Sequence, residues 1–165
     1  MLNKGQTLFV FEGSRTEDKV VQMLERNFLG EKVTLKCVYD AEIYQLYNII
    51  KGEGKFSLDI VSLLKERTKE NAEILKDYKR DSFAYVYLFF DYDAHQNNLR
   101  STTDISPNEV IEEMLDVFDN ETEHGKLYIN YPMIESIRDF SNITCNPWTL
   151  DCIWDLTRGD QYKTV

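Results

Sequence analysis

The chain has 165 residues, of which 42% are hydrophobic and 29% are charged, and its formal net charge is -10. This length and composition indicate one globular domain with a buried core and exclude a disordered chain. The acidic charge argues against a broad nucleic-acid-binding surface, because such a field repels a polyanion. Contact with a phosphate backbone would have to be local, or depend on a metal ion, another domain or another subunit.

Cysteine and histidine are scarce: the sequence holds three cysteines and only two histidines, His95 and His124. An odd cysteine count without a CxxC pair argues against a disulfide framework and against a structural zinc site. Free thiols are typical of a reducing compartment, so we expect a cytoplasmic protein. No stretch approaches the roughly 20 apolar residues of a membrane helix, and we expect no membrane contact.

The first half of the chain predicts two strands, each followed by helical sequence. The short apolar run 6–12 is typical of a buried strand. Residues 13–30 predict a helix, in which Ser14 and Glu17 form a capping box. The elements expected next are a strand over 32–40, a helix over 41–54 and a long charged helix over 57–81.

The second half continues the alternation of strands and helices. Residues 82–93 are almost continuously apolar, which predicts a strand in the middle of the sheet with both faces covered. Residues 106–120 predict a helix that starts with a capping box. A fourth strand over 125–132 and a short helix over 133–140 are expected next, before an extension of the domain from about residue 141.

This order of elements predicts an α/β fold. We expect a Rossmann-like, mostly parallel four-stranded sheet flanked by helices, in a single domain over residues 1–165. Crossover connections in such sheets are right-handed, and ligands bind at the carboxyl ends of the strands.

Carboxylates stand where three of the four predicted strands end. Glu12 ends the first strand, Asp91 and Asp93 end the third, and Glu135 follows the fourth. At one edge of a parallel sheet these side chains would repel each other and raise each other's pKa unless a divalent cation joined them. Oxygen ligands without histidine or cysteine favour Mg²⁺, Mn²⁺ or Ca²⁺ over zinc. The i, i+2 spacing of the two aspartates lets both face one ion.

These acidic motifs resemble those of the Toprim domain, the catalytic module of topoisomerases, bacterial primases, RecR-type repair proteins and OLD-family nucleases. The resemblance rests on "FVFEGSRTEDKVV" at 9–21 and "YLFFDYDAH" at 87–95. The first motif places a Glu-Gly at the end of a strand, and the second places a DxD at the end of a later one. The EGxxTE form is similar to the OLD-like and RloB-like branch of bacterial defence systems.

The resemblance implies Mg²⁺-dependent hydrolysis or transfer of phosphodiesters in nucleic acid, in bacterial defence or repair. Asp91 and Asp93 would bind Mg²⁺ (or Mn²⁺), and Glu12 would be a further ligand or the general acid-base. The metal would stabilise the charge that develops during in-line displacement.

Four other residues near this edge each have two interpretations. Arg15, at a helix start, could hold a substrate phosphate or be a surface arginine. His95 could assist proton transfer or be a solvated loop histidine. Glu135 is a further metal ligand or an exposed helix carboxylate. Glu17 completes the capping box, and at most it would contact a metal ligand rather than the metal itself. The aspartate pair itself could instead cap the following turn.

Alternatives to a nuclease stay open at this point. A non-catalytic Toprim-like interaction module in a larger complex, or in a homo-oligomer, would fit the acidic charge. A glycosyltransferase also uses a DxD, but it expects a nucleotide site on the first strand, which Glu12 and Gly13 do not resemble. A phosphoacceptor receiver domain needs an acid pair after the first strand, and none is evident.

Overall fold

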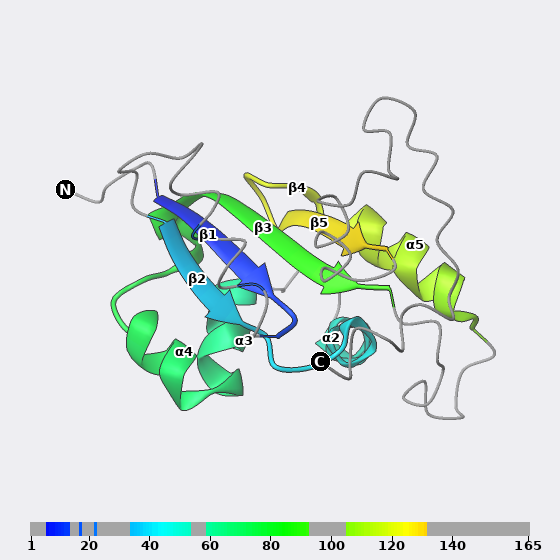
Figure 1. Ribbon diagram of the computed structural model, residues 1–165, viewed down its shortest axis with the longest axis horizontal. Coiled ribbons are helices and arrows are strands. Elements are labelled where there is room, and N and C mark those ends of the chain that lie inside the picture. Colours follow the sequence, from blue (N-terminus) through cyan, green and yellow to red (C-terminus); the bar gives the residue numbers. More distant parts are fainter. Residues whose placement is uncertain are drawn as a thin grey trace, which may run out of the picture.

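A five-stranded sheet with the strand order β2-β1-β3-β5-β4 forms the centre of the structure (Figure 1). The computed structural model describes residues 6–13, 17, 22, 34–53, 59–92 and 105–131. The strands are β1 (Gln6–Phe11), β2 (Thr34–Val38), β3 (Phe83–Asp91), β4 (Asp119–Asn120) and β5 (Gly125–Asn130). Strands β1, β2, β3 and β5 run parallel to one another. Strand β4 pairs antiparallel with β5.

The α/β class is confirmed, whereas the prediction of a four-stranded sheet is wrong. The strand that was not predicted is β4, which has two residues. Its antiparallel pairing with β5 makes the sheet mixed. Asp119 and Asn120 belong to the residue types depleted in strands, and two residues are too few to show an alternating pattern. The turn after them contacts β3, since the backbone N–H of Val86 donates to the carbonyl of Glu121 at 2.9 Å.

Helices α2, α3 and α4 lie on the lower side of the sheet in Figure 1. The helical elements are α2 (Ile43–Glu53), α3 (Ile60–Arg67), α4 (Lys69–Ile74), the 3-10 turn η3 (Arg80–Ser82) and α5 (Pro107–Val117). The predicted capping box of α5 is confirmed, with Ser106 and Glu109 each bonding the other's backbone N–H. Within the described ranges, no helix has the length and apolar character needed to cross a membrane.

The prediction of one long helix over 57–81 is wrong, because the helix breaks at Thr68. The backbone of Thr68 is extended, with φ -138° and ψ 151°, and its hydroxyl accepts a hydrogen bond from the N–H of Asn71 at 3.1 Å. Threonine hydroxyls compete with helical hydrogen bonds in this way, which makes them good N-caps and poor helix interiors. The charged segment therefore folds as α3, α4 and η3.

The two faces of the sheet are packed differently. Val10, Leu88 and Leu127 belong to one buried cluster that also includes side chains of α2, α3 and α5. The opposite face carries aromatic rings, of which Phe11 and Phe89 stack with centroids 5.0 Å apart. The central position of β3 is confirmed. The prediction that both its faces are covered is wrong near its start, where Tyr85 is 44% exposed.

Asn71 of α4 protects the outer edge of β2. Its side-chain Nδ2 donates to the carbonyl of Val38 at 2.7 Å, and its Oδ1 accepts from the N–H of Val38 at 3.4 Å. The amide thus bonds this edge residue as a neighbouring strand would. Unpaired groups on an edge strand invite pairing with other chains, and this contact reduces that exposure.

Asn71→Ala should lower the free energy of unfolding by about 1 to 3 kcal/mol, because it removes the hydrogen-bond partners of the Val38 backbone from a buried position. Urea unfolding followed by circular dichroism measures the loss. Asn48→Ala, at an exposed position of α2, is the matched control and should cost nothing. Equal stability of Asn71→Ala and wild type would contradict this role.

Tyr39, which follows β2, is fully buried. Its hydroxyl has no hydrogen-bond partner among the described residues. The Arg67 guanidinium lies over its ring, 4.6 Å from the centroid, and Nε of Arg67 donates to the Tyr39 carbonyl at 3.1 Å. Burial raises the pKa of the Tyr39 hydroxyl above its ordinary value of 10.0, and the charge of Arg67 only partly opposes this.

The raised pKa of Tyr39 predicts a loss of stability in alkali. The unfolded chain loses the phenolic proton near pH 10, while the folded chain keeps it to higher pH, so this contribution is complete below pH 10 and lost above it. Tyr39→Phe should be at least as stable as wild type near neutral pH, since no hydrogen bond is lost.

Between about pH 8 and about pH 11, the melting temperature of Tyr39→Phe should fall less than that of wild type. Thermal unfolding at the two pH values tests this. A variant that is clearly less stable than wild type at pH 8 would show that the hydroxyl has a partner after all.

Candidate acidic site at the carboxyl edge of the sheet

Hydrogen bonds link three polar residues at the ends of β1, β3 and β5. Glu12, directly after β1, accepts a hydrogen bond through Oε2 from the backbone N–H of Asp91 at 3.0 Å. Asp91, the last residue of β3, accepts through Oδ1 from Nδ2 of Asn130 at 3.1 Å. A continuous row of contacts therefore crosses three neighbouring strands at their carboxyl ends.

Backbone pairing beyond the strand ends fixes the positions of these residues. The N–H of Glu12 donates to the Phe89 carbonyl at 3.1 Å, and the N–H of Tyr92 donates to the Asn130 carbonyl at 2.9 Å. The parallel register sets Asp91 opposite Asn130. Because this geometry comes from the sheet rather than from a loop, the Glu12 and Asp91 side chains start from a rigid support.

A third carboxylate, that of Glu17, lies beside Gly13. Glu17 is only 8% exposed, and a Cβ built on Gly13 would lie 3.3 Å from its Oε1. The lack of a side chain at position 13 thus lets this carboxylate approach the chain directly after Glu12. The sequence predicted a helix cap for Glu17 and, at most, a place behind the metal ligands, because its burial depends on the tertiary structure.

Asn130 is not among the site residues predicted from the sequence. Its position was informative, because a polar residue near the end of a predicted buried strand points to the carboxyl edge. The acidic motifs point to charged ligands, whereas Asn130 orients a carboxylate through its side-chain amide. Asp40 reaches the same edge through its backbone: it follows β2 with a left-handed φ of 59°, and its N–H donates to the Glu12 carbonyl at 3.0 Å.

The donor set at this edge consists of oxygens. Glu12 and Asp91 supply carboxylates, which suits the one or two carboxylates that commonly hold Mg²⁺ together with water and phosphate oxygens. In the described part of the chain, no group of three or more His, Cys, Asp or Glu side chains is arranged to hold a metal ion. The described oxygens therefore fit a hard cation only as a partial site.

Four of the predicted site residues lie outside the described residues. They are the predicted metal ligands Asp93 and Glu135 and the predicted substrate contacts Arg15 and His95. Of the predicted set, the structure describes Glu12 and Asp91, and it brings these two together.

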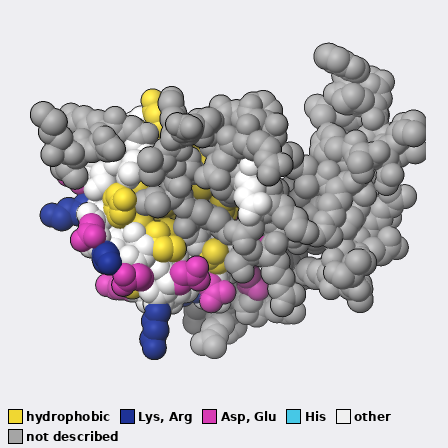
Figure 2. Space-filling model, turned by 60° about the vertical axis from the view of Figure 1, so that its left-hand side comes forward, with side chains coloured by type: hydrophobic (Ala, Val, Ile, Leu, Met, Phe, Trp, Pro, Cys, Tyr) yellow, Lys and Arg dark blue, Asp and Glu magenta, His cyan; other side chains and the backbone are white. Residues whose placement is uncertain are grey.

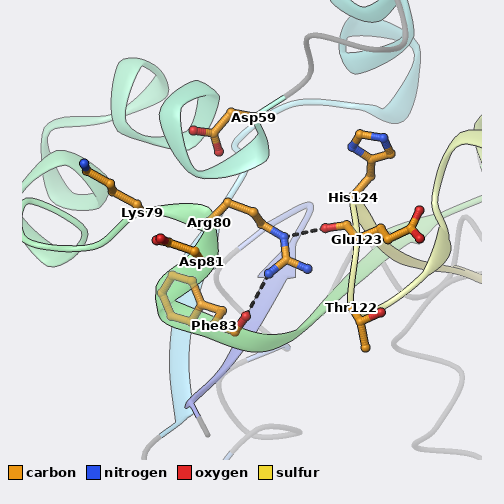
Figure 3. A pocket seen from close by; sticks show the side chains of 8 residues that line it. All are labelled: Asp59, Lys79, Arg80, Asp81, Phe83, Thr122, Glu123 and His124. Atoms are coloured by element: carbon orange, nitrogen blue, oxygen red, sulfur yellow. Dashed lines mark hydrogen bonds between the residues drawn. The ribbon is translucent and has the colours of Figure 1, made fainter. Parts of the chain in front are cut away.

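The opposite edge of the sheet carries a surface cavity of about 660 Å³ at the start of β3 and β5 (Figure 3). Two of the charged side chains that line it, Asp59 and Arg80, make structural contacts. Asp59 caps α3 by accepting from the N–H of Val61 at 3.0 Å. The Arg80 guanidinium donates to the carbonyls of Phe83, Glu121 and Glu123. Burial lowers the pKa of Arg80, and the charge of Asp59 partly counters this effect. These contacts give Asp59 and Arg80 a structural role.

Arg80→Ala should lower the free energy of unfolding by about 2 kcal/mol, because three backbone carbonyls lose a charged donor that joins η3 to the turn before β5. Arg80→Lys should recover part of the loss, since lysine keeps the charge but lacks the fork of donors. Lys76→Ala, which removes an exposed cation, should change stability by less than about 0.5 kcal/mol. Urea unfolding measures all three, and an Arg80→Ala protein as stable as Lys76→Ala would contradict the assignment.

No protein-family model matches this sequence, and neither a curated protein nor a solved structure is similar enough to count as a match. The resemblance to Toprim domains therefore rests on the two short motifs at 9–21 and 87–95.

Proposed function

We propose that this domain hydrolyses or transfers phosphodiester bonds of nucleic acid with Mg²⁺ or Mn²⁺ at the edge that carries Glu12 and Asp91. One observation supports this most directly: the Glu12 carboxylate bonds the backbone of Asp91, so the acidic ends of two neighbouring parallel strands meet. Asp93, two residues on, is the expected third ligand. The bound metal would polarise the phosphoryl oxygens and stabilise their charge in the transition state.

The residues of the chain hold and orient the acidic groups in this proposal. The N–H of Asp91 fixes the Glu12 carboxylate, which then serves as a ligand or as the general acid-base. Asn130 fixes the Asp91 carboxylate from the other side. Partners that orient ligands in this way strengthen metal sites, which gives Asn130 a function without direct metal contact.

The overall charge limits how nucleic acid could be held. Acidic and basic side chains are mixed on the flank that carries α4 (Figure 2), where Lys76 and Glu73 form an exposed ion pair at 2.7 Å. With a net charge of -10, the domain gains little from long-range attraction of phosphates. We infer that binding is local and runs through the metal, or is assisted by a partner domain or a further subunit.

A non-catalytic interaction module is the second candidate. The observation in its favour is that Glu12 and Asp91 both have protein partners and that the described residues include no cluster of three metal-ligating side chains. In that case the row of contacts at the carboxyl edge would serve to hold the strand ends together.

Wild-type protein should cleave labelled single- or double-stranded DNA or RNA in Mg²⁺ or Mn²⁺, and cleavage should stop with a chelator. Glu12→Gln and Asp91→Asn should each reduce the rate by at least about 100-fold, because each removes a charge that holds the metal. Both substitutions keep an oxygen that can accept the observed hydrogen bond, so both proteins should fold. Glu112→Gln, at an exposed position of α5, should leave the rate unchanged.

Mg²⁺ should also raise the melting temperature of wild type, because a ligand that binds only the folded state stabilises it. This increase should be smaller in Asp91→Asn. If no substrate is cleaved with either metal and the melting temperature does not respond to Mg²⁺, the interaction module is the correct alternative.

A further inference from the structure

Two tyrosines stand next to the acidic site. Tyr92 follows Asp91, Tyr131 follows Asn130, and their rings meet edge to face with centroids 5.5 Å apart. Tyr92 is anchored, since its hydroxyl donates to Oδ1 of Asn108 at 2.8 Å and its ring packs against the main core. Tyr131 is 56% exposed, the highest value among the large hydrophobic residues that the structure describes.

The position of Tyr131 is fixed by the same contacts that form the site. The carbonyl of Asn130 accepts from the N–H of Tyr92, and the side chain of Asn130 bonds Asp91. Tyr131 is therefore one residue away from a group that touches the Asp91 carboxylate. The anchored Tyr92 packs against the Tyr131 ring, while more than half of the surface of Tyr131 faces solvent.

An aromatic ring suits the charge of this domain. Most proteins hold nucleic acid through lysine and arginine contacts with phosphates, which a net charge of -10 does not favour. Stacking of a base on an aromatic side chain requires no positive charge and tolerates any base sequence. It also requires an uncovered base face, which unpaired nucleotides offer and duplexes do not.

We propose that Tyr131 stacks against an unpaired base of a single-stranded nucleic acid whose phosphodiester lies at the Glu12–Asp91 edge. The inference rests on the proposed function, and it specifies the substrate class: single strands, or unpaired ends and loops, in preference to continuous duplex. Tyr131 is then a substrate-binding residue, and Tyr92 positions it.

The test is fluorescence anisotropy with a labelled mixed-sequence single strand and with the same sequence as a duplex, in Ca²⁺. Tyr131→Ala should weaken single-strand binding roughly 5- to 150-fold, the range observed for loss of one base–aromatic stack. Tyr131→Phe and Tyr131→Trp should bind like wild type, because both keep an aromatic face. Tyr131→Leu, which keeps apolar bulk without that face, should bind like Tyr131→Ala.

Tyr85→Ala is the matched control. Tyr85 is 44% exposed and also contacts one neighbouring tyrosine ring, that of Tyr87 at 6.4 Å. It lies six residues before Asp91 on β3, about 20 Å from the acidic edge at the rise of a strand. Its removal should leave binding unchanged. Tyr131→Ala should also leave the dependence of affinity on salt unchanged, because the ring neutralises no phosphate.

The outcomes separate this inference from the proposed function. Cleavage by wild type together with unchanged single-strand binding by Tyr131→Ala would overturn the stacking role and leave the nuclease standing. Single-strand binding that depends on Tyr131, without cleavage in any metal, would support stacking and overturn the catalytic proposal. Absence of both binding and cleavage by wild type would overturn both.

Discussion

The parallel pairing of β1 with β3 is the constraint on which the rest of the structure depends. Glu12 and Asp91 are 79 positions apart in the chain, and only this pairing brings their strand ends together. In the part of it that the structure describes, the intervening chain supplies β2 and the four helical elements α2, α3, α4 and η3. The entropic cost of closing so long a connection grows slowly with its length. Burial of apolar side chains such as Leu8, Val86 and Leu88 between the sheet and the helices opposes that cost.

The abrupt change from apolar to acidic residues at the end of β3 has a structural explanation. Phe90 is fully buried in the core, while Asp91 is partly exposed at the edge. A carboxylate so close to the core needs hydrogen-bond partners. Asn130 supplies a donor to its side chain, and Glu12 accepts from its backbone. Both partners come from the strands on either side, so the acidic position is stable only within the assembled sheet.

The two edges of the sheet differ in what their polar groups do. At the edge where β3 and β5 begin, Arg80 donates hydrogen bonds to backbone carbonyls and Asp59 caps the start of α3. These contacts stabilise the connections there. At the carboxyl edge, carboxylates stand beside an exposed aromatic ring, Tyr131. This asymmetry agrees with the general behaviour of parallel α/β sheets, in which ligands bind beyond the carboxyl ends of the strands.

The sequence by itself determined the α/β class, the four parallel strands, the capping box of α5 and the approach of Glu12 to Asp91. These features follow from signals within one element, such as apolar runs and N-caps, and from the rule that parallel strands share an edge. Only the tertiary structure decided the pairing of β4, the contact of Asn71 with β2 and the contact of Asn130 with Asp91. Each of these depends on which residues of distant segments face each other. These contacts form only when the sheet and the helices pack together, and a pattern within one element does not specify them.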